Sequence, residues 1–144
     1  MNATMVKFGY PSSLVKELEY WAILLRPAQA TLGALVLAAK SDAAQFSALP
    51  AEAFAELADA ARAVEQGLSR FRPYAKINYL MLMMVDPHVH FHVLPRYAEA
   101  QNFAGKSFAD PGWPGVPDLK HQNQIGDAER GLLLDAMRQA FAAD

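Results

Sequence analysis

The sequence predicts an α+β domain in which helices pack against an antiparallel sheet. Two features lead to this prediction. Apolar segments of strand length come in two pairs joined by short connections, and two longer segments carry apolar residues at helical spacing. At 144 residues, of which 53% are apolar and 19% charged, the chain has enough apolar surface for one core, so a single domain over 1–144 is expected.

The first pair of strands is expected over residues 19–26 and 31–38. The segment 19–26 is rich in aromatic and aliphatic residues and is ended by Pro27. The segment 31–38 is more continuously apolar and is expected to be more deeply buried. Because few residues separate the two segments, they are predicted to form an antiparallel hairpin.

A helix is predicted over residues 50–72, ended by Pro73. Ser47 is expected to cap it, or Pro50 to occupy its first turn. Apolar residues recur there at steps of three and four, which is typical of one helix face packed on a sheet. The residues of this face are Phe54, Leu57, Ala61, Val64, Leu68 and Phe71.

The second pair of strands is expected over residues 77–85 and 88–97, with a tight break at Asp86-Pro87. Residues 98–125 alternate proline with glycine and are predicted to be an irregular lid, binding loop or contact arm. Asp127 is expected to cap a final helix that extends to residue 143. One side of this helix would carry Leu133, Leu134, Met137 and Phe141.

Charge and composition exclude several classes of function. A net charge of −2 without a long run of one sign argues against nucleic acid as a partner. A site for one small phosphorylated ligand stays open, because it needs only one or two cations. The absence of cysteine excludes disulfides and thiolate chemistry and is compatible with a cytoplasmic protein. No signal segment and no apolar run of membrane-spanning length is present, so no membrane partner is expected.

Three of the four histidines lie at alternate positions, His88, His90 and His92. Because strand side chains alternate between faces, these three would share one face and the intervening apolar residues the other. Three interpretations are open. The histidines are packed strand residues, or two of them bind zinc or iron together with a distant ligand, or one of them is a nucleophile. The available distant metal ligands are His121, Asp86 and Asp110.

The segment 88–94 has the form His-φ-His-φ-His-φ-φ, where φ is apolar, and Pro95-Arg96 follows it. This segment resembles the signature of the histidine triad (HIT) superfamily. The resemblance extends to the order of the strands and the helix, and it covers about residues 14–97. It implies a HIT-like antiparallel sheet of about five strands with helices packed on one face.

The resemblance also implies an activity. HIT proteins are nucleotide hydrolases and nucleotidyl transferases that act at the α-phosphate, here of a dinucleoside polyphosphate or a nucleoside phosphoramidate. His90 would attack phosphorus and become nucleotidylated, while His88 and His92 would orient it and contact phosphate. The chemistry itself requires no metal, although a divalent cation can accompany a polyphosphate substrate. Members are generally homodimers whose sheets join across a two-fold axis.

Two departures from the family pattern motivate an alternative function. Many members carry a longer glycine-rich loop with a phosphate-contacting residue before the triad, whereas this chain has only residues 84–87, including Asp86. Many also carry a further histidine after a glycine on the second strand, where this chain has Ala34 after Gly33. The alternative is a nucleotide-binding or interaction module with little turnover.

Four further residues are candidates for substrate contacts. Asn78 lies one strand from the triad and could contact ribose or phosphate, and Arg96 could neutralise phosphate charge. Asp86 occupies the shortened loop, and Trp113 could stack on a base. Each residue also has a structural alternative, such as a strand-end polar group, a salt bridge at the rim, or packing of the loop on the body of the domain.

Overall fold

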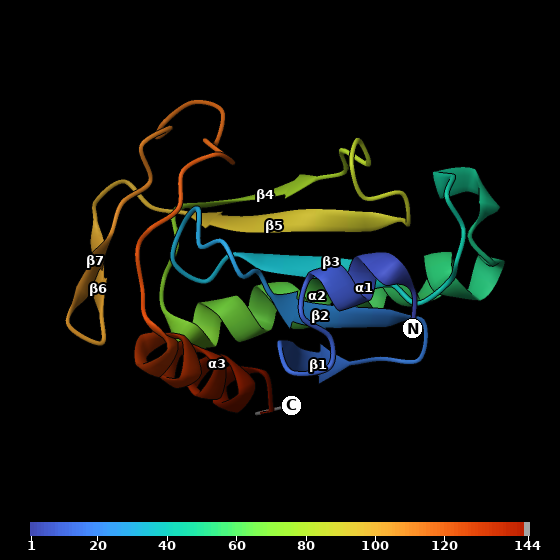
Figure 1. The fold of residues 1–144 in the computed structure, drawn as a ribbon, viewed down its shortest axis with the longest axis horizontal. Coiled ribbons are helices and arrows are strands. Elements are labelled where there is room, and N and C mark those ends of the chain that lie inside the picture. The colour runs from blue at the N-terminus through green and yellow to red at the C-terminus, as the bar shows by residue number, and fades with distance from the viewer. Residues whose placement is uncertain (143–144) are drawn as a thin grey trace.

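The computed structural model describes residues 1–142, which form a five-stranded antiparallel sheet with helices and a separate two-stranded hairpin (Figure 1). The fold class and a sheet of about five strands are as predicted, although only four of these strands had been located in the sequence. The order of strands in the main sheet is β1-β2-β3-β5-β4. In chain order the elements are α1 (Ala3–Lys7), β1 (Leu14–Glu17), β2 (Trp21–Leu25), β3 (Leu35–Ala39), α2 (Ala51–Phe71), β4 (Lys76–Leu80), β5 (His90–Arg96), β6 (Gln101–Phe103), β7 (Lys106–Phe108) and α3 (Asp127–Ala142).

The predicted hairpin between the first two strands is confirmed, since β2 pairs with β3 in antiparallel register. Both strands are buried along their whole length because both faces of the sheet are covered there. The short edge strand β1 was not found by the sequence pattern. Its four residues, Leu14–Glu17, mix apolar and charged side chains, and a bulge interrupts their pairing with β2.

The segment predicted as a strand over 77–85 forms a strand only to Leu80. Beyond that residue the chain turns, and Met83 adopts a positive φ of 51°. The pairing of β4 with β5 ends at Leu80 and His92, and before β5 the Val89 N–H donates to the Ala43 carbonyl while its carbonyl accepts from the Ala39 N–H. The apolar residues after Leu80 therefore form an exposed loop rather than a longer strand.

The prediction that residues 98–125 are irregular is wrong for part of this segment. The segment contains the hairpin of β6 and β7, whose turn has positive φ at Ala104 and Gly105. The final helix α3 begins at Asp127 as predicted, and its buried residues are Leu133, Met137 and Phe141. Residue 143 of the predicted helix lies outside the described part of the chain.

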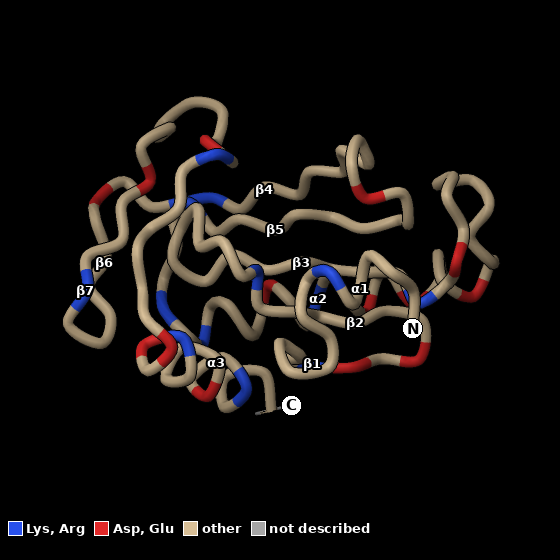
Figure 2. The backbone as a smooth tube through the Cα atoms, viewed as in Figure 1, with Lys and Arg blue, Asp and Glu red and all other residues tan. Residues whose placement is uncertain are grey.

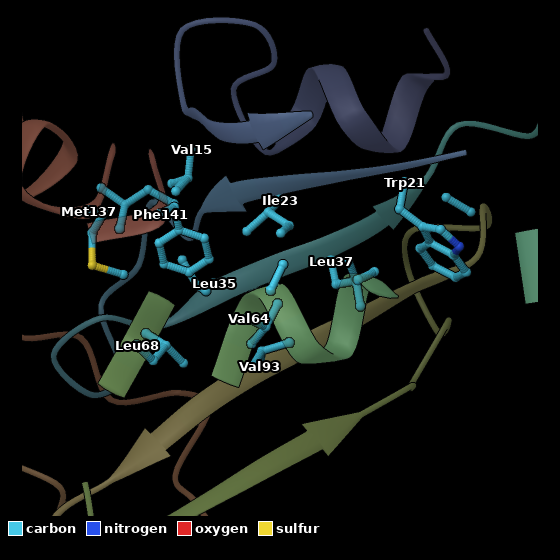
Figure 3. Close-up of a cluster of buried hydrophobic side chains, with 14 of the residues drawn as sticks. Val15, Trp21, Ile23, Leu35, Leu37, Val64, Leu68, Val93, Met137 and Phe141 are labelled. Atoms are coloured by element: carbon cyan, nitrogen blue, oxygen red, sulfur yellow. The ribbon is translucent and has the colours of Figure 1, made fainter. Parts of the chain in front are cut away.

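The two long helices cover one face of the sheet. Odd-numbered residues of the strands, such as Trp21, Ile23 and Leu37, point into this core with α2 and α3 (Figure 3). The short helix α1 covers the opposite face, where Met5 and Phe8 pack on even-numbered strand residues. In Figure 1, α1 crosses in front of β2 and β3 while α2 lies behind them. The expectation of helices on one face therefore holds for α2 and α3 but not for α1.

The buried side of α2 is narrower than the predicted stripe. Phe54 is exposed, and small residues including Ala53, Ala60 and Gly67 face the core instead. The small residues allow close approach: a Cβ on Gly67 would lie 2.5 Å from the Phe141 ring of α3. Ser47 does not cap the helix, because it lies in a 3₁₀ turn and Pro50 occupies the N-cap position.

Charged residues of both signs are interspersed along the chain, without a run of one sign (Figure 2). Strands β2 and β3 carry none. Among the described residues, no helix is both long and apolar enough to cross a membrane.

Candidate active site

The histidines His90 and His92 lie on β5, between β3 and the edge strand β4, on the face covered by α1. The ring centroids of the two imidazoles are 5.1 Å apart, and the Phe8 ring contacts both at 5.5 and 5.7 Å. Phe91 and Val93 point to the opposite face, toward the main core. The predicted division of the strand into a histidine face and an apolar face is therefore correct for these residues.

His88 precedes β5 but still joins the site through α1. Its Nδ1 atom is 3.0 Å from the Thr4 hydroxyl, and its backbone N–H donates to the same hydroxyl. Helix α1 is fixed over this face by Asn2, whose side-chain amide donates to the Ala39 and Ser41 carbonyls and whose oxygen caps the helix. The N-terminal segment thus positions the first histidine of the triad.

The hydrogen bond made by His90 determines which of its nitrogens is free. Its Nδ1 atom is 2.7 Å from the His88 carbonyl oxygen. Because a carbonyl only accepts, Nδ1 must carry the proton, and the lone pair of the neutral ring lies on Nε2. His90 is only 1% exposed, so this nitrogen lies in a largely dry environment. A neutral imidazole held in this tautomer has the form needed for nucleophilic attack.

His92 is held in the opposite tautomer. The Arg26 Nε–H group donates to the Nδ1 atom of His92 at 3.2 Å. Because arginine only donates, this Nδ1 is unprotonated, and neutral His92 carries its proton on Nε2. Burial is the largest cause that lowers the pKa of His92 to about 4, followed by the charge of Arg26 and the interaction with His90, against an opposing effect of Asp86. His92 is therefore a neutral hydrogen-bond donor near pH 7.

A small pocket opens beside the two imidazoles. It has a volume of about 110 Å³, and the loop between β4 and β5 forms its other wall. Asp86 of this loop lines the pocket and forms an ion pair of 2.7 Å with Lys7 of α1. The complete lining is Leu82, Met83, Met84, Val85, Asp86, His90 and His92. The structure thus places Asp86 beside His90 and His92, and contact of Asp86 with substrate stays a prediction.

Arg96 and Asn78 are engaged elsewhere. The Arg96 guanidinium makes two hydrogen bonds to the Asp110 carboxylate, of 2.6 and 2.9 Å, and a third to the Asn78 side-chain oxygen. It also donates to the Gly115 carbonyl. This buried cluster ties residues 110–115 to β4 and β5. Direct contact of Asn78 or Arg96 with substrate stays a prediction, and so does stacking by the half-buried Trp113.

Of the residues considered as distant metal ligands, Asp86 lines the pocket beside His90 and His92, whereas Asp110 and His121 bond to other residues. Asp110 is paired with Arg96, and the His121 Nε2–H donates to the Asn123 side-chain oxygen. Over residues 1–142, no group of three or more histidine, aspartate or glutamate side chains is arranged to hold a metal ion.

Sequence reasoning missed Arg26, Thr4 and Phe8 as members of the site. Arg26 follows an apolar strand and precedes a proline, so it has the appearance of an ordinary strand end. Thr4 and Phe8 lie at least 80 positions before the triad, Thr4 in the five-residue helix α1 and Phe8 at its C-cap. Their contacts are long-range, and no local pattern indicates them. The spacing of four residues between Thr4 and Phe8, which places both on one helical face, was the only signal available.

Comparison with known proteins identifies the family. Residues 9–99 match the HIT domain. No curated protein matches the chain. Among solved structures, a histidine triad protein from Bradyrhizobium japonicum is similar with a TM-score of 0.73 at 19% identity, over 98% of this chain and 96% of that one.

Two further structures agree. A histidine triad protein from Sinorhizobium meliloti has a TM-score of 0.73 at 18% identity, over 97% of this chain and 95% of that one. A zinc-bound histidine triad family protein from Mycobacterium smegmatis has a TM-score of 0.62 at 20% identity, over 97% and 94% of the two chains. These likenesses show the fold, and the domain match shows the family. This chain, with its triad of His88, His90 and His92, belongs to the HIT family.

Proposed function

We propose that this protein is a nucleotide hydrolase or nucleotidyl transferase that acts at the α-phosphate of a nucleotide conjugate through His90. The observation that carries the proposal is the pair of opposite tautomers. The Nε2 atom of His90 has a free lone pair, and the Nε2 atom of its neighbour His92 has a proton to donate. A nucleophile beside a neutral donor suits attack on phosphorus, where positioning and charge stabilisation dominate.

The reaction would proceed in two displacements. The Nε2 lone pair of His90 forms a bond to the α-phosphorus as the bond from phosphorus to the leaving group breaks. The Nε2–H of His92 donates to a phosphate oxygen, and His88 passes a proton to the leaving group. Water, or another acceptor in a transfer, then attacks phosphorus and gives its proton back to His88, while the bond from phosphorus to His90 breaks and the nucleotide product leaves. None of these steps requires a metal, although a divalent cation can accompany a polyphosphate.

The pocket and its surroundings support a nucleotide conjugate as substrate. A pocket of about 110 Å³ accepts a phosphate group but is smaller than the roughly 300–1,000 Å³ typical of sites that enclose a ligand. The rest of the nucleotide would therefore extend over the adjoining loop, where Met84 and Val85 are exposed by 87% and 81%. Dinucleoside polyphosphates and nucleoside phosphoramidates both carry an α-phosphate that could enter the pocket and a nucleoside that could lie over the loop.

The rival function is a nucleotide-binding module with little turnover. It is favoured by the carboxylate of Asp86, which lies in the pocket and repels a phosphate unless Lys7 neutralises it. An enzyme and a binding module differ in turnover, not in affinity. A metalloenzyme is a third possibility, because one similar structure is zinc-bound. Its activity would be lost when a chelator removes the metal.

The test is release of AMP from adenosine 5′-phosphoramidate and from a diadenosine polyphosphate. The variant His90→Asn keeps a side-chain donor for the His88 carbonyl but lacks the nucleophilic nitrogen. His121→Ala removes a histidine outside the site and is the matched control. We expect turnover by the wild type and by His121→Ala, at least about 10³-fold less by His90→Asn, and no effect of EDTA on the phosphoramidate. Nucleotide binding by the wild type without turnover would instead support the binding module.

We also propose a cytoplasmic homodimer joined at β4. The strand order leaves β1 and β4 at the edges of the sheet. Edge β1 is partly covered, since the Arg138 side chain of α3 donates to the Leu14 carbonyl. Beside β4 runs an open groove of about 500 Å³, walled on its other side by residues 115–117. An uncovered edge strand beside a groove suits pairing with a second copy.

A further inference from the structure

Arg26 is a buried cation without a counter-ion. Arg26 is 9% exposed, and among residues 1–142 no carboxylate lies within ion-pair distance of its guanidinium. Burial lowers the pKa of this arginine, although the group stays charged near neutral pH. Burying an unpaired charge is costly, so such a group is retained where an anion completes the site.

The position of Arg26 connects it to the triad. It follows β2, and its backbone N–H donates to the Ala34 carbonyl at the start of β3. Its side chain crosses β3 on the histidine face and reaches His92 on β5. Ala34 lies on this same face and is fully buried.

We propose that Arg26 is a positioning residue that holds His92 as an Nε2–H donor and supplies, through this imidazole, the positive charge for binding the substrate's phosphate. The inference rests on the proposed function and deepens it. Arg26 lies on the Nδ1 side of His92 and does not line the pocket, so it would act through the ring. The counter-ion of the buried guanidinium would be the phosphate on the far side of the ring.

The charges around His92 are consistent with this role. Arg26 faces the ring from the end of β2, His90 lies beside it on β5, and Asp86 lies across the pocket. Lys7 of α1 pairs with Asp86 and offsets its charge. Because the pKa of His92 is lowered to about 4, the ring stays neutral above pH 5 and can transmit the effect of Arg26 without charging itself.

A purely structural role for Arg26 is the alternative. Its Nη1 group also donates to the Ala28 carbonyl and so fixes the turn after β2. Three variants separate the roles. In Arg26→Gln, the amide nitrogen takes the place of Nε and keeps the bond to His92 without the charge. Arg26→Lys keeps the charge, and Arg26→Met removes both. Arg130→Gln is the control, because Arg130 holds the same turn from outside by donating to the Pro27 carbonyl.

The first measurement is ¹⁵N NMR of the histidine rings, which does not depend on activity. We expect His92 to be protonated on Nε2 alone in the wild type, in Arg26→Gln and in Arg130→Gln, and to become a mixture of tautomers in Arg26→Met. The pKa of His92 should rise in Arg26→Gln and Arg26→Met, because a neighbouring positive charge is lost. A proton on Nδ1 in the wild type, or no change in any Arg26 variant, would overturn the proposal.

The second measurement is the affinity for AMP against that for adenosine, which lacks the phosphate. We expect Arg26→Gln to weaken AMP binding by roughly tenfold, as a charge acting across one ring allows, and to leave adenosine binding unchanged. Arg26→Lys should recover part of the loss, and Arg130→Gln should bind both ligands like the wild type. Equal loss for both ligands would indicate a structural role. AMP binding as expected without any turnover would contradict the proposed function but not the role of Arg26.

Discussion

The two histidines of β5 differ because different groups bind their Nδ1 atoms. A carbonyl at the Nδ1 of His90 leaves Nε2 free to attack, and a guanidinium at the Nδ1 of His92 leaves Nε2 protonated. The same side chain, two residues apart, is thus given two chemical characters by its neighbours. Burial then keeps His92 neutral.

The neutral state of His92 predicts a pH dependence of stability. Its pKa is about 4 in the folded protein against 6.5 for an unperturbed ring. Above pH 6.5 neither state is protonated. As the pH falls toward 4, the unfolded chain binds a proton that the folded protein does not, so the free energy of unfolding decreases by up to about 3 kcal/mol.

Urea unfolding at pH 7 and at pH 4.5 checks this prediction. The variant His92→Asn keeps an acceptor for Arg26 but does not titrate, so it should lose less stability on acidification than the wild type. An equal loss in the two proteins would show that His92 does not cause the acid sensitivity.

The contact between Thr4 and His88 predicts a second residue-scale effect. Thr4→Val removes the hydroxyl that meets the His88 ring and backbone, at nearly constant volume. We expect kcat to fall by about tenfold, since one hydrogen bond that orients a catalytic group is lost, and Thr4→Ser to restore it. Steady-state kinetics on the phosphoramidate, with thermal unfolding as the check on folding, decides. Unchanged kcat in Thr4→Val would remove α1 from the catalytic site.

At the scale of elements, local patterns predicted well where one element carried its own signal. The hairpin of β2 and β3, the long helix α2 and the start of α3 follow from apolar spacing and turn residues. The strand expected over 77–85 failed at Leu80, because an apolar run does not show where its partner turns away. The hairpin of β6 and β7 was missed because its three-residue strands are mostly polar.

The residues of the site also differ in whether a local sequence pattern indicates them. The triad and Asp86 lie in one short stretch of sequence, and the structure places Asp86 in the pocket beside His90 and His92. Arg26 and Thr4 reach the triad through contacts separated by 66 and 84 positions. Only the assembled sheet, with β3 between β2 and β5, makes these contacts visible.

The packing of α2 on α3 gives a test with an internal control. Gly67→Ala would place a Cβ 2.5 Å from the Phe141 ring, whereas a Cβ on Gly131 of α3 meets nothing within 4 Å. We expect Gly67→Ala to destabilise the protein by about 1–3 kcal/mol through overpacking. Gly131→Ala should stabilise it by about 0.5–1 kcal/mol, because alanine favours a helix interior.

Chemical unfolding of both variants beside the wild type measures these changes. Helix propensity alone would make both substitutions stabilising. That result would contradict the close contact between Gly67 and Phe141.

At the scale of the whole molecule, β4 forms an open edge of the sheet, and a groove lies between this strand and residues 115–117. Val116, in this groove, is 83% exposed. If a second copy pairs here, Val116→Asp should weaken dimerisation by at least about tenfold. Leu132→Asp, at an exposed site on α3, should not. Sedimentation equilibrium measures the dimer dissociation constants of the wild type and both variants. A wild-type monomer at micromolar concentration would rule out the proposed dimer.

The bond between His90 and phosphorus is the step on which the proposed function depends. Rapid acid-free quenching of the wild type with adenosine 5′-phosphoramidate, followed by intact-protein mass and fragment analysis, measures it directly. We expect one adenylyl group per chain, located on His90 and absent from His90→Asn. Turnover without an adduct and with inversion of configuration at phosphorus would mean that water attacks the substrate directly, and His90 would then not be the nucleophile.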